Sequence, residues 1–187
     1  MYYSVVKELI MKRNELLKMI IAGICLALAY VLPFLTGNNY KLGSMLCLMH
    51  IPVLLCGFFC GWHWGLSVGA IAPLLRTFTL GAPVLFPTAI CMAFELAAYG
   101  AIAGAMHRAL PKKKIFILCS LATSMVCGRI VFGIIKYFCI GINGSYAFSL
   151  FLTEAFVTAL PGIIIQVVLI PVIVISLDNK KVLNLNP

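Results

Sequence analysis

Residues 19–35 read MIIAGICLALAYVLPFL, a run that contains no charged side chain. A helix of about 20 predominantly apolar residues crosses the hydrocarbon core of a bilayer. This run belongs to a longer apolar stretch, and five more stretches follow it, separated mostly by glycine and proline. The six stretches cover residues 16–35, 43–60, 66–80, 85–107, 115–138 and 148–177. The pattern predicts an all-α integral membrane protein whose residues 1–187 form one domain of six transmembrane helices.

The composition supports this prediction. Of the 187 residues, 63% are hydrophobic and only 10% are charged, and the mean hydropathy is +1.10. A water-soluble fold of this size could not hide so much apolar surface. Six spans would use about 120 residues, which leaves no room for a soluble catalytic or nucleotide-binding domain. No phosphate-binding loop of the form GxxxxGK[ST] occurs. We therefore expect no enzymatic activity and no cofactor in this chain.

The positive charge is placed as membrane topology requires. The formal net charge is +9, which in a soluble protein would suggest binding to nucleic acid. Here the cations cluster in the two tails and in the loop after the fourth stretch: Lys7, Lys12, Arg13, Lys18, Arg108, Lys112, Lys113, Lys114, Lys180 and Lys181. Basic residues concentrate in cytoplasmic segments. We therefore expect a bilayer rather than a nucleic acid as the partner, with both termini cytoplasmic and loops 36–43, 81–85 and 139–147 facing outward.

Six ionisable side chains fall inside the apolar stretches. An ionisable group costs roughly 2.5–3.5 kcal/mol at the centre of a span, so each one needs a functional or structural reason. With the orientation above, all six map to the outer half of the membrane. They are His50, Arg76, Glu95, Arg129, Lys136 and Glu154.

Helical spacing groups these residues with other polar side chains. Glu95 and Tyr99 are four residues apart and share a helix face, and Glu154 precedes Thr158 by the same interval. Arg129 and Lys136 are seven apart and also share a face. The spacing predicts a pocket that opens outward and is lined by both signs of charge.

A structural interpretation of the same charges stays open. Glu95 and Glu154 would then pair with Arg129 and Arg76 only to hold the helices together, while Lys136 would extend to the membrane surface. His50 precedes Ile51-Pro52, where a proline kink frees a carbonyl group, so a structural histidine is an equal alternative to a ligand contact.

Several kinds of chemistry have no support in the sequence. There is no HExxH zinc-protease motif and no GxSxG nucleophile motif. The eight cysteines contain no CxxC pair, so no metal site is expected. A channel would favour a ring of one residue type, whereas a cluster of mixed charge suits a polar organic molecule better.

The first stretch contains two pairs of small residues at helical spacing, Gly23 with Ala27 and Cys25 with Ala29. Small residues four apart allow another helix to approach closely, either inside the bundle or from a partner. Together with the six spans, the two basic tails and the glycine-bounded turn between the second and third stretches, this pattern resembles the substrate-binding (S) components of energy-coupling factor (ECF) vitamin transporters. The segment His50-Ile51-Pro52-Val53 resembles the start of the second span in pantothenate-type members.

The resemblance implies a function and a set of partners. S components bind a vitamin near the outer face of a prokaryotic plasma membrane and associate with a transmembrane T component and two cytoplasmic ATPases, which use the ATP. Gly23 and Ala27 would form the surface that docks on the T component. The expected binding residues in the helices are His50, Arg76, Glu95, Tyr99, Arg129 and Glu154, and the expected lid residues are Asn39, Tyr40, Asn143 and Tyr146.

The ligand and two other functions stay open at this point. The surplus of cations in the outer half favours a ligand with a carboxylate, such as pantothenate, folate, biotin or niacin. One alternative is a self-sufficient secondary transporter, against which stand the small size and the lack of an inverted repeat. The other is a membrane assembly subunit whose buried charges only pair helices.

Overall fold

The computed structural model describes residues 2–36, 45–111, 114–140, 153 and 157–179. All regular structure in these segments is helical. In chain order the elements are α1 (Tyr2–Val31), η1 (Leu32–Thr36), α3 (His50–Cys60), α4 (Trp62–Leu80), η2 (Leu85–Ala89), α5 (Ile90–Ala109), α6 (Lys114–Ile140) and α8 (Leu160–Asn179). The all-α prediction is confirmed for the described part of the chain.

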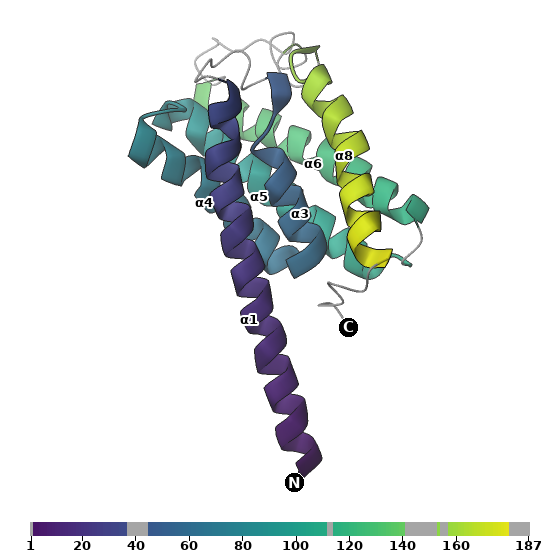
Figure 1. Cartoon of the computed structure of the whole chain (residues 1–187). Helices are drawn as coiled ribbons and strands as arrows, with labels where there is room; N and C mark the ends of the chain where they lie inside the picture. The colour runs from purple at the N-terminus through teal and green to yellow at the C-terminus, as the bar shows by residue number, and fades with distance from the viewer. Residues whose placement is uncertain (1, 37–44, 112–113, 141–152, 154–156, 180–187) are drawn as a thin grey trace.

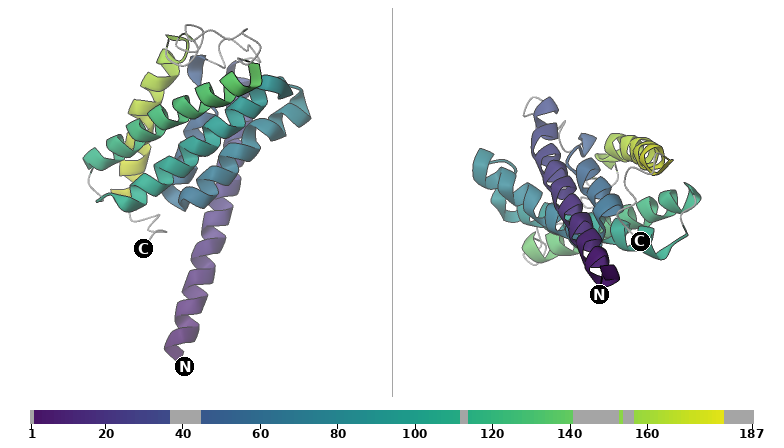
Figure 2. Two further views of the ribbon diagram at one scale, coloured as in Figure 1. Left: turned by 180° about the vertical axis from the view of Figure 1, so that it is seen from behind. Right: turned by 60° about the horizontal axis from the view of Figure 1, so that its bottom comes forward.

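The long helices run up and down the bundle in alternation (Figure 1). The N-terminus of α1 and the C-terminal end of α8 point toward the same end of the molecule. α1 has 30 residues, and its N-terminal half extends well beyond the other helices (Figures 1 and 2). We call the end of the molecule where α1 begins and α8 ends the terminal end, and the opposite end the far end.

The short helix α3 lies inside the bundle and contacts α1, α4, α5 and α8. Nine of its eleven residues are buried, as expected for a helix that is apolar on every side. Two groups of buried side chains meet at this helix. One joins α1, α3 and α4 and includes Ala29, Val53 and Ala72. The other joins α3 to α5, α6 and α8.

Glycines bring α3, α4 and α5 into backbone contact. A Cβ atom on Gly65 of α4 would lie 2.5 Å from the carbonyl oxygen of Gly100 on α5, and a Cβ on Gly100 would collide with the carbonyl of Gly65. Gly57 of α3 meets the same Gly100 carbonyl, and Gly69 meets the carbonyl of Leu96. Only glycine permits such an approach, which also increases the van der Waals contact between the helices.

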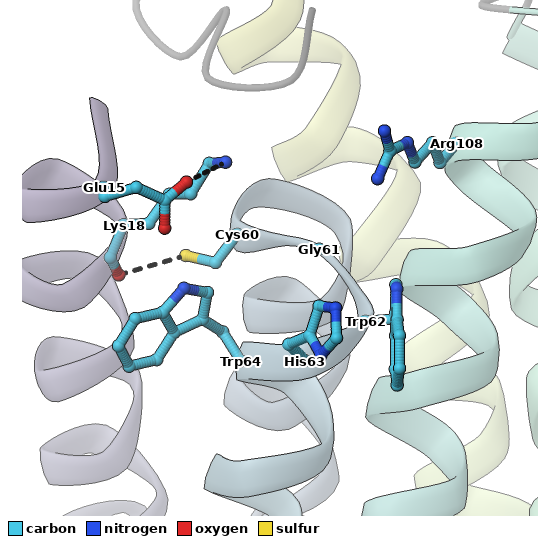
Figure 3. A pocket seen from close by; sticks show the side chains of 8 residues that line it. All are labelled: Glu15, Lys18, Cys60, Gly61, Trp62, His63, Trp64 and Arg108. Carbon is cyan, nitrogen blue, oxygen red and sulfur yellow. Dashed lines mark hydrogen bonds and ion pairs between the residues drawn. The ribbon is translucent and has the colours of Figure 1, made fainter. Parts of the chain in front are cut away.

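A single residue connects α3 to α4. Gly61 has a φ of 92°, a left-handed conformation that favours glycine, and α4 begins directly after it at Trp62 (Figure 3). The sequence suggested a longer turn from Gly61 to Gly65, which was wrong. Gly65 and Gly69 instead lie within α4, where the absence of a side chain is needed for contact with α5.

Two other helix starts differ from the apolar stretches, each for a local reason. Met45 and Leu46 are helical, but Cys47 has a φ of 48°, which breaks the helix, so that the continuous helix α3 begins at His50. Phe86 is extended before Pro87, so the continuous helix α5 begins at Ile90. The helix α8 begins at Leu160, with Pro161 in its first turn, where proline is tolerated, and the expected start of the sixth stretch near residue 148 lies outside the described part of the chain.

Four described helical segments are long and apolar enough to cross a membrane: Met11–Leu35, Leu85–Ala109, Lys114–Ile140 and Leu160–Leu177. At 1.5 Å per residue, the eleven residues of α3 extend only about 16 Å, less than the hydrocarbon thickness. α4 is not among the four candidates. The described residues therefore support a membrane protein with several spans, and six spans stay a prediction.

The glycine contact between α4 and α5 can be tested with a matched pair of variants. Gly100→Ala should lower the apparent Tm by roughly 5–10 °C, because overpacking against a backbone costs about 1–3 kcal/mol or more. Gly23→Ala is the control, since Gly23 is an exposed helical glycine with no atom within 4 Å of the added Cβ. It should leave the Tm unchanged or slightly higher. Equal Tm values for the two variants would contradict the proposed contact.

Candidate functional site

A buried ion pair joins α5 to α6 in the half of the bundle nearer the far end. Arg129 Nη1 lies 2.9 Å from Glu95 Oε1, and the two side chains are only 9% and 3% exposed. Glu95 stands six residues into α5, and Arg129 stands eleven residues before the end of α6. Isolated charges at such depth are costly, so each of these groups compensates the other.

His50 and Tyr99 extend this ion pair into a cluster. His50, the first residue of α3, has Nε2 3.6 Å from Glu95 Oε1. Its ring meets the ring of Tyr99 edge-on, with centroids 5.0 Å apart. Tyr99 follows Glu95 by one helical turn and is fully buried. Its ring occupies the space beside Gly128, where a Cβ atom would lie 2.8 Å from the ring carbons.

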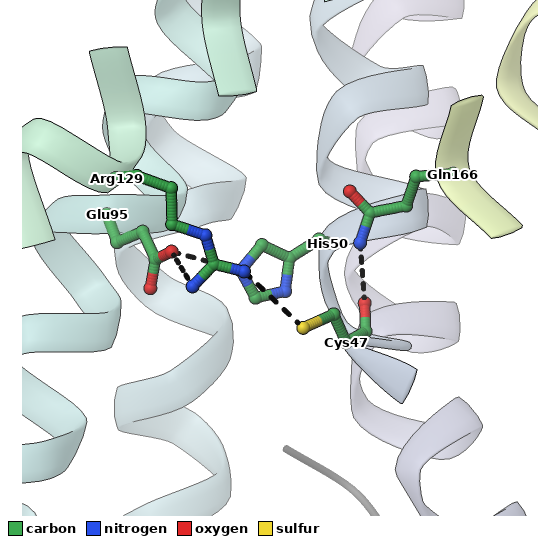
Figure 4. Close-up of polar contacts among 5 residues, drawn as sticks. All are labelled: Cys47, His50, Glu95, Arg129 and Gln166. Carbon is green, nitrogen blue, oxygen red and sulfur yellow. Dashed lines mark hydrogen bonds and ion pairs between the residues drawn. The ribbon is translucent and has the colours of Figure 1, made fainter. Parts of the chain in front are cut away.

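Residues from two other segments complete the cluster (Figure 4). Arg129 Nη2 lies 3.7 Å from the sulfur of Cys47, the left-handed residue that precedes α3. Gln166 of α8 donates a hydrogen bond from Nε2 to the carbonyl oxygen of Cys47 at 3.4 Å. We call Cys47, His50, Glu95, Tyr99, Arg129 and Gln166 the polar cluster. Its residues come from α3 and the segment before it, α5, α6 and α8, so the cluster lies between these helices.

The polar cluster has more hydrogen-bonding capacity than it uses. The buried atoms without a hydrogen-bond partner in the described chain include Nδ1 and Nε2 of His50, Oη of Tyr99, Nε of Arg129 and Oε1 of Gln166. Buried polar groups in proteins are nearly always hydrogen-bonded, and each exception calls for an explanation. Donors and acceptors of both kinds are thus present in the cluster: the buried atoms include the Tyr99 hydroxyl, the Arg129 Nε and the Gln166 Oε1. Among the described residues, no group of three or more His, Cys, Asp or Glu side chains is placed to hold a metal ion.

Comparison with known proteins agrees with a binding role. Residues 17–174 match the family described as the ECF transporter, substrate-specific component. The chain belongs to this family. No curated protein and no solved structure was found to match it. The chain is therefore an S component, a class of transporter subunits that bind substrates and are not enzymes. Membership also agrees with the several apolar helices of the fold.

One cation predicted for the site of this S component, Arg76, lies elsewhere. Arg76 is buried on α4, where it donates a hydrogen bond from Nη1 to the carbonyl oxygen of Tyr30 at 3.2 Å. Its guanidinium also lies 5.2 Å from the ring centroid of Phe34. It thus contacts the C-terminal end of α1, where the helix leaves carbonyl groups unpaired. The ammonium of Lys136 lies 5.1 Å from the ring centroid of Phe132.

Five other predicted site residues lie outside the described part of the chain. These are Asn39, Tyr40, Asn143, Tyr146 and Glu154. Their assignment to a lid or to the ligand stays a prediction. Of the predicted binding residues that the structure describes, it brings together His50, Glu95, Tyr99 and Arg129.

The two pairs of small residues on α1 face different surroundings. Cys25 and Ala29 are buried against α3 and α4. Gly23 and Ala27 are exposed on the other side of the helix, where a Cβ atom added at Gly23 would meet no described atom of another helix within 4 Å. The first pair therefore serves packing inside the bundle, whereas the second pair is free to contact another helix.

Cys47 and Gln166 were not predicted from the sequence, because neither is a charged residue or a histidine within an apolar stretch. Gln166 is a single amide between Ile165 and Val167 in a long apolar stretch, and it is only 1% exposed. That isolation was a usable signal, since a neutral amide in a membrane helix also needs partners. Nothing in the pattern distinguished Cys47 from the other cysteines.

A double-mutant cycle tests whether the ion pair is energetically coupled. Glu95→Gln or Arg129→Gln alone should destabilise the protein by about 3–5 kcal/mol, because each leaves one buried charge uncompensated. The double variant should lose less than the sum of the two, with a coupling energy above about 1 kcal/mol in denaturant titrations.

The control cycle uses Glu8 and Lys12 on α1. These side chains are 2.8 Å apart but 61% and 73% exposed, so Glu8→Gln and Lys12→Gln should show a coupling energy below about 0.5 kcal/mol. A coupling energy at Glu95 and Arg129 no larger than that of the exposed pair would show that the two charges do not compensate each other.

Proposed function

We propose that this S component captures a vitamin at the outer face of a prokaryotic plasma membrane and that the polar cluster is its binding site. The observation that carries the proposal is the set of unpartnered buried polar atoms around the Glu95–Arg129 ion pair. A purely structural ion pair needs no such excess of donors and acceptors. A ligand with hydroxyl, amide or carboxylate groups would satisfy them.

The proposed orientation places both termini in the cytoplasm and assigns six spans to the chain. Its support is the concentration of cations in the tails and in residues 108–114, which agrees with the positive-inside rule. In this orientation the far end of the bundle faces outward, so the polar cluster lies in the outer half of the membrane, where an external ligand has the shorter path to it.

The proposed partners are a transmembrane T component and two ATPases that supply the energy. The exposed Gly23–Ala27 pair on α1 would form part of the docking surface, since its backbone is open to close approach by another helix. This assignment accounts for two small residues on a face that contributes nothing to packing within the described bundle.

Pantothenate is the first ligand to test. It combines a carboxylate with hydroxyl and amide groups, which suit the mixed donors and acceptors of the polar cluster. The charge argument for a carboxylate is weaker in the folded chain than in the sequence. Arg129 is already paired with Glu95, and Arg76 and Lys136 contact other groups. The panel should therefore include uncharged vitamins beside pantothenate, folate, biotin and niacin.

The test is a search for retained ligand. The protein is purified in mild detergent and denatured, and the released small molecules are identified by mass spectrometry and then titrated back into stripped protein. The proposal predicts one vitamin-sized compound per chain, which also raises the Tm. No released compound and no Tm shift across the panel would contradict it. Uptake driven by the chain alone in liposomes would instead identify a self-sufficient transporter.

Tyr99→Phe separates a binding role from a structural one. The Tyr99 hydroxyl has no hydrogen-bond partner in the described chain, so its removal should leave the Tm of the ligand-free protein unchanged or higher. If the hydroxyl bonds the ligand, the Kd should rise roughly tenfold, the equivalent of about 1.4 kcal/mol.

Tyr137→Phe is the matched control, because Tyr137 on α6 is 55% exposed and is not one of the residues of the polar cluster. It should change neither the Tm nor the Kd. A Tyr99→Phe protein that binds the ligand as tightly as this control would exclude the hydroxyl from the site.

A further inference from the structure

A second polar site lies at the terminal end of the bundle, about 15 Å along α3 from His50. It is a pocket of about 350 Å³ between α1, the α3–α4 turn and the end of α5 (Figure 3). Its size is near the lower limit for small-molecule sites. The residues that line it are Glu15, Lys18, Cys60, Gly61, Trp62, His63, Trp64 and Arg108.

One cation in the lining of the pocket, Arg108, has no acidic partner among the residues that the structure describes. Lys18 Nζ donates a hydrogen bond to Glu15 Oε1 at 2.8 Å, so these two charges form an ion pair and compensate each other. Arg108 is exposed near the end of α5 and has no ion-pair partner in the described chain. In Figure 3 its guanidinium lies on the same side of the pocket as Trp62. An unpaired guanidinium with a planar set of donors is suited to phosphate.

Aromatic side chains form the other part of the lining. Trp62 and Trp64 are the two tryptophans of the chain, and both line this pocket. The Trp62 and His63 rings are stacked, with centroids 3.5 Å apart. Tryptophan concentrates at the level of the lipid headgroups, because its ring is apolar while its N–H is polar. The pocket thus has the composition of a site at the membrane–water boundary, and the basic residues 108–114 begin at the same place.

We propose that this pocket binds the phosphate of an anionic phospholipid headgroup, with Arg108 contacting the phosphate and Trp62 and Trp64 contacting the adjoining glycerol and acyl carbons. Basic pockets between membrane helices on the cytoplasmic side bind anionic lipids by the same combination of charge and apolar contact. The pocket is separate from the polar cluster, so this site does not depend on which vitamin the protein captures.

The test measures the Tm of the purified full chain in detergent while a short-chain lipid is titrated. Phosphatidylglycerol is the anionic probe, phosphatidylcholine the zwitterionic probe, and inorganic phosphate tests for a soluble ion. Phosphatidylglycerol should raise the Tm with a half-maximal concentration at least fivefold lower than that of phosphatidylcholine. Arg108→Gln should raise that concentration roughly tenfold, as expected for loss of a charge-assisted hydrogen bond.

Arg13→Gln is the control, because Arg13 is an exposed arginine of α1 that does not line the pocket. It should bind phosphatidylglycerol within twofold of the unmodified chain. The proposal is overturned if Arg108→Gln binds as well as this control or if the two lipids act equally. A full Tm shift from inorganic phosphate alone would also overturn it, because the ligand would then be a soluble anion.

Discussion

The contact between Glu95 and Arg129 constrains the rest of the molecule. Two opposite charges at this depth are tolerated only side by side, so α5 and α6 must pack with these positions facing each other. Once they do, Tyr99 lies one turn from Glu95 against Gly128, and His50 reaches the same carboxylate from α3. The ion pair thus brings the unpartnered polar atoms of His50 and Tyr99 close together, and the proposed binding site consists of these atoms and their neighbours.

The glycine contacts make this convergence possible. Gly57, Gly65 and Gly100 let three backbones approach so closely that an added Cβ atom would collide with the neighbouring helix, and the short helix α3 packs against several longer helices. A larger residue at Gly57 would push α3 away from α5 and move His50 away from Glu95, whereas one at Gly65 or Gly100 would separate α4 from α5. In a bilayer, where lipid tails are as apolar as leucine, such contacts replace much of the hydrophobic force that holds soluble bundles together.

The sequence predicted what depends on composition and spacing along one helix. Buried charges stood out at Glu95 and Arg129, and the four-residue interval placed Tyr99 on the face of Glu95. It could not predict what depends on how helices rotate against each other. Arg76 was expected beside the other charges, but α4 presents it to the carbonyl of Tyr30. The start of α3 was not predicted because it depends on the positive φ of Cys47, and a cysteine in the sequence does not indicate a positive φ.

The most direct test of the account is an experimental structure of the purified protein with its retained ligand. The account predicts a vitamin-sized molecule among α3, α5, α6 and α8. Its polar atoms should lie within hydrogen-bond distance of the Tyr99 hydroxyl, Arg129 Nε and Gln166 Oε1, the atoms that lack partners in the described chain. A ligand bound elsewhere, with the Glu95–Arg129 pair and its neighbours unchanged, would show that these charges only hold the helices together.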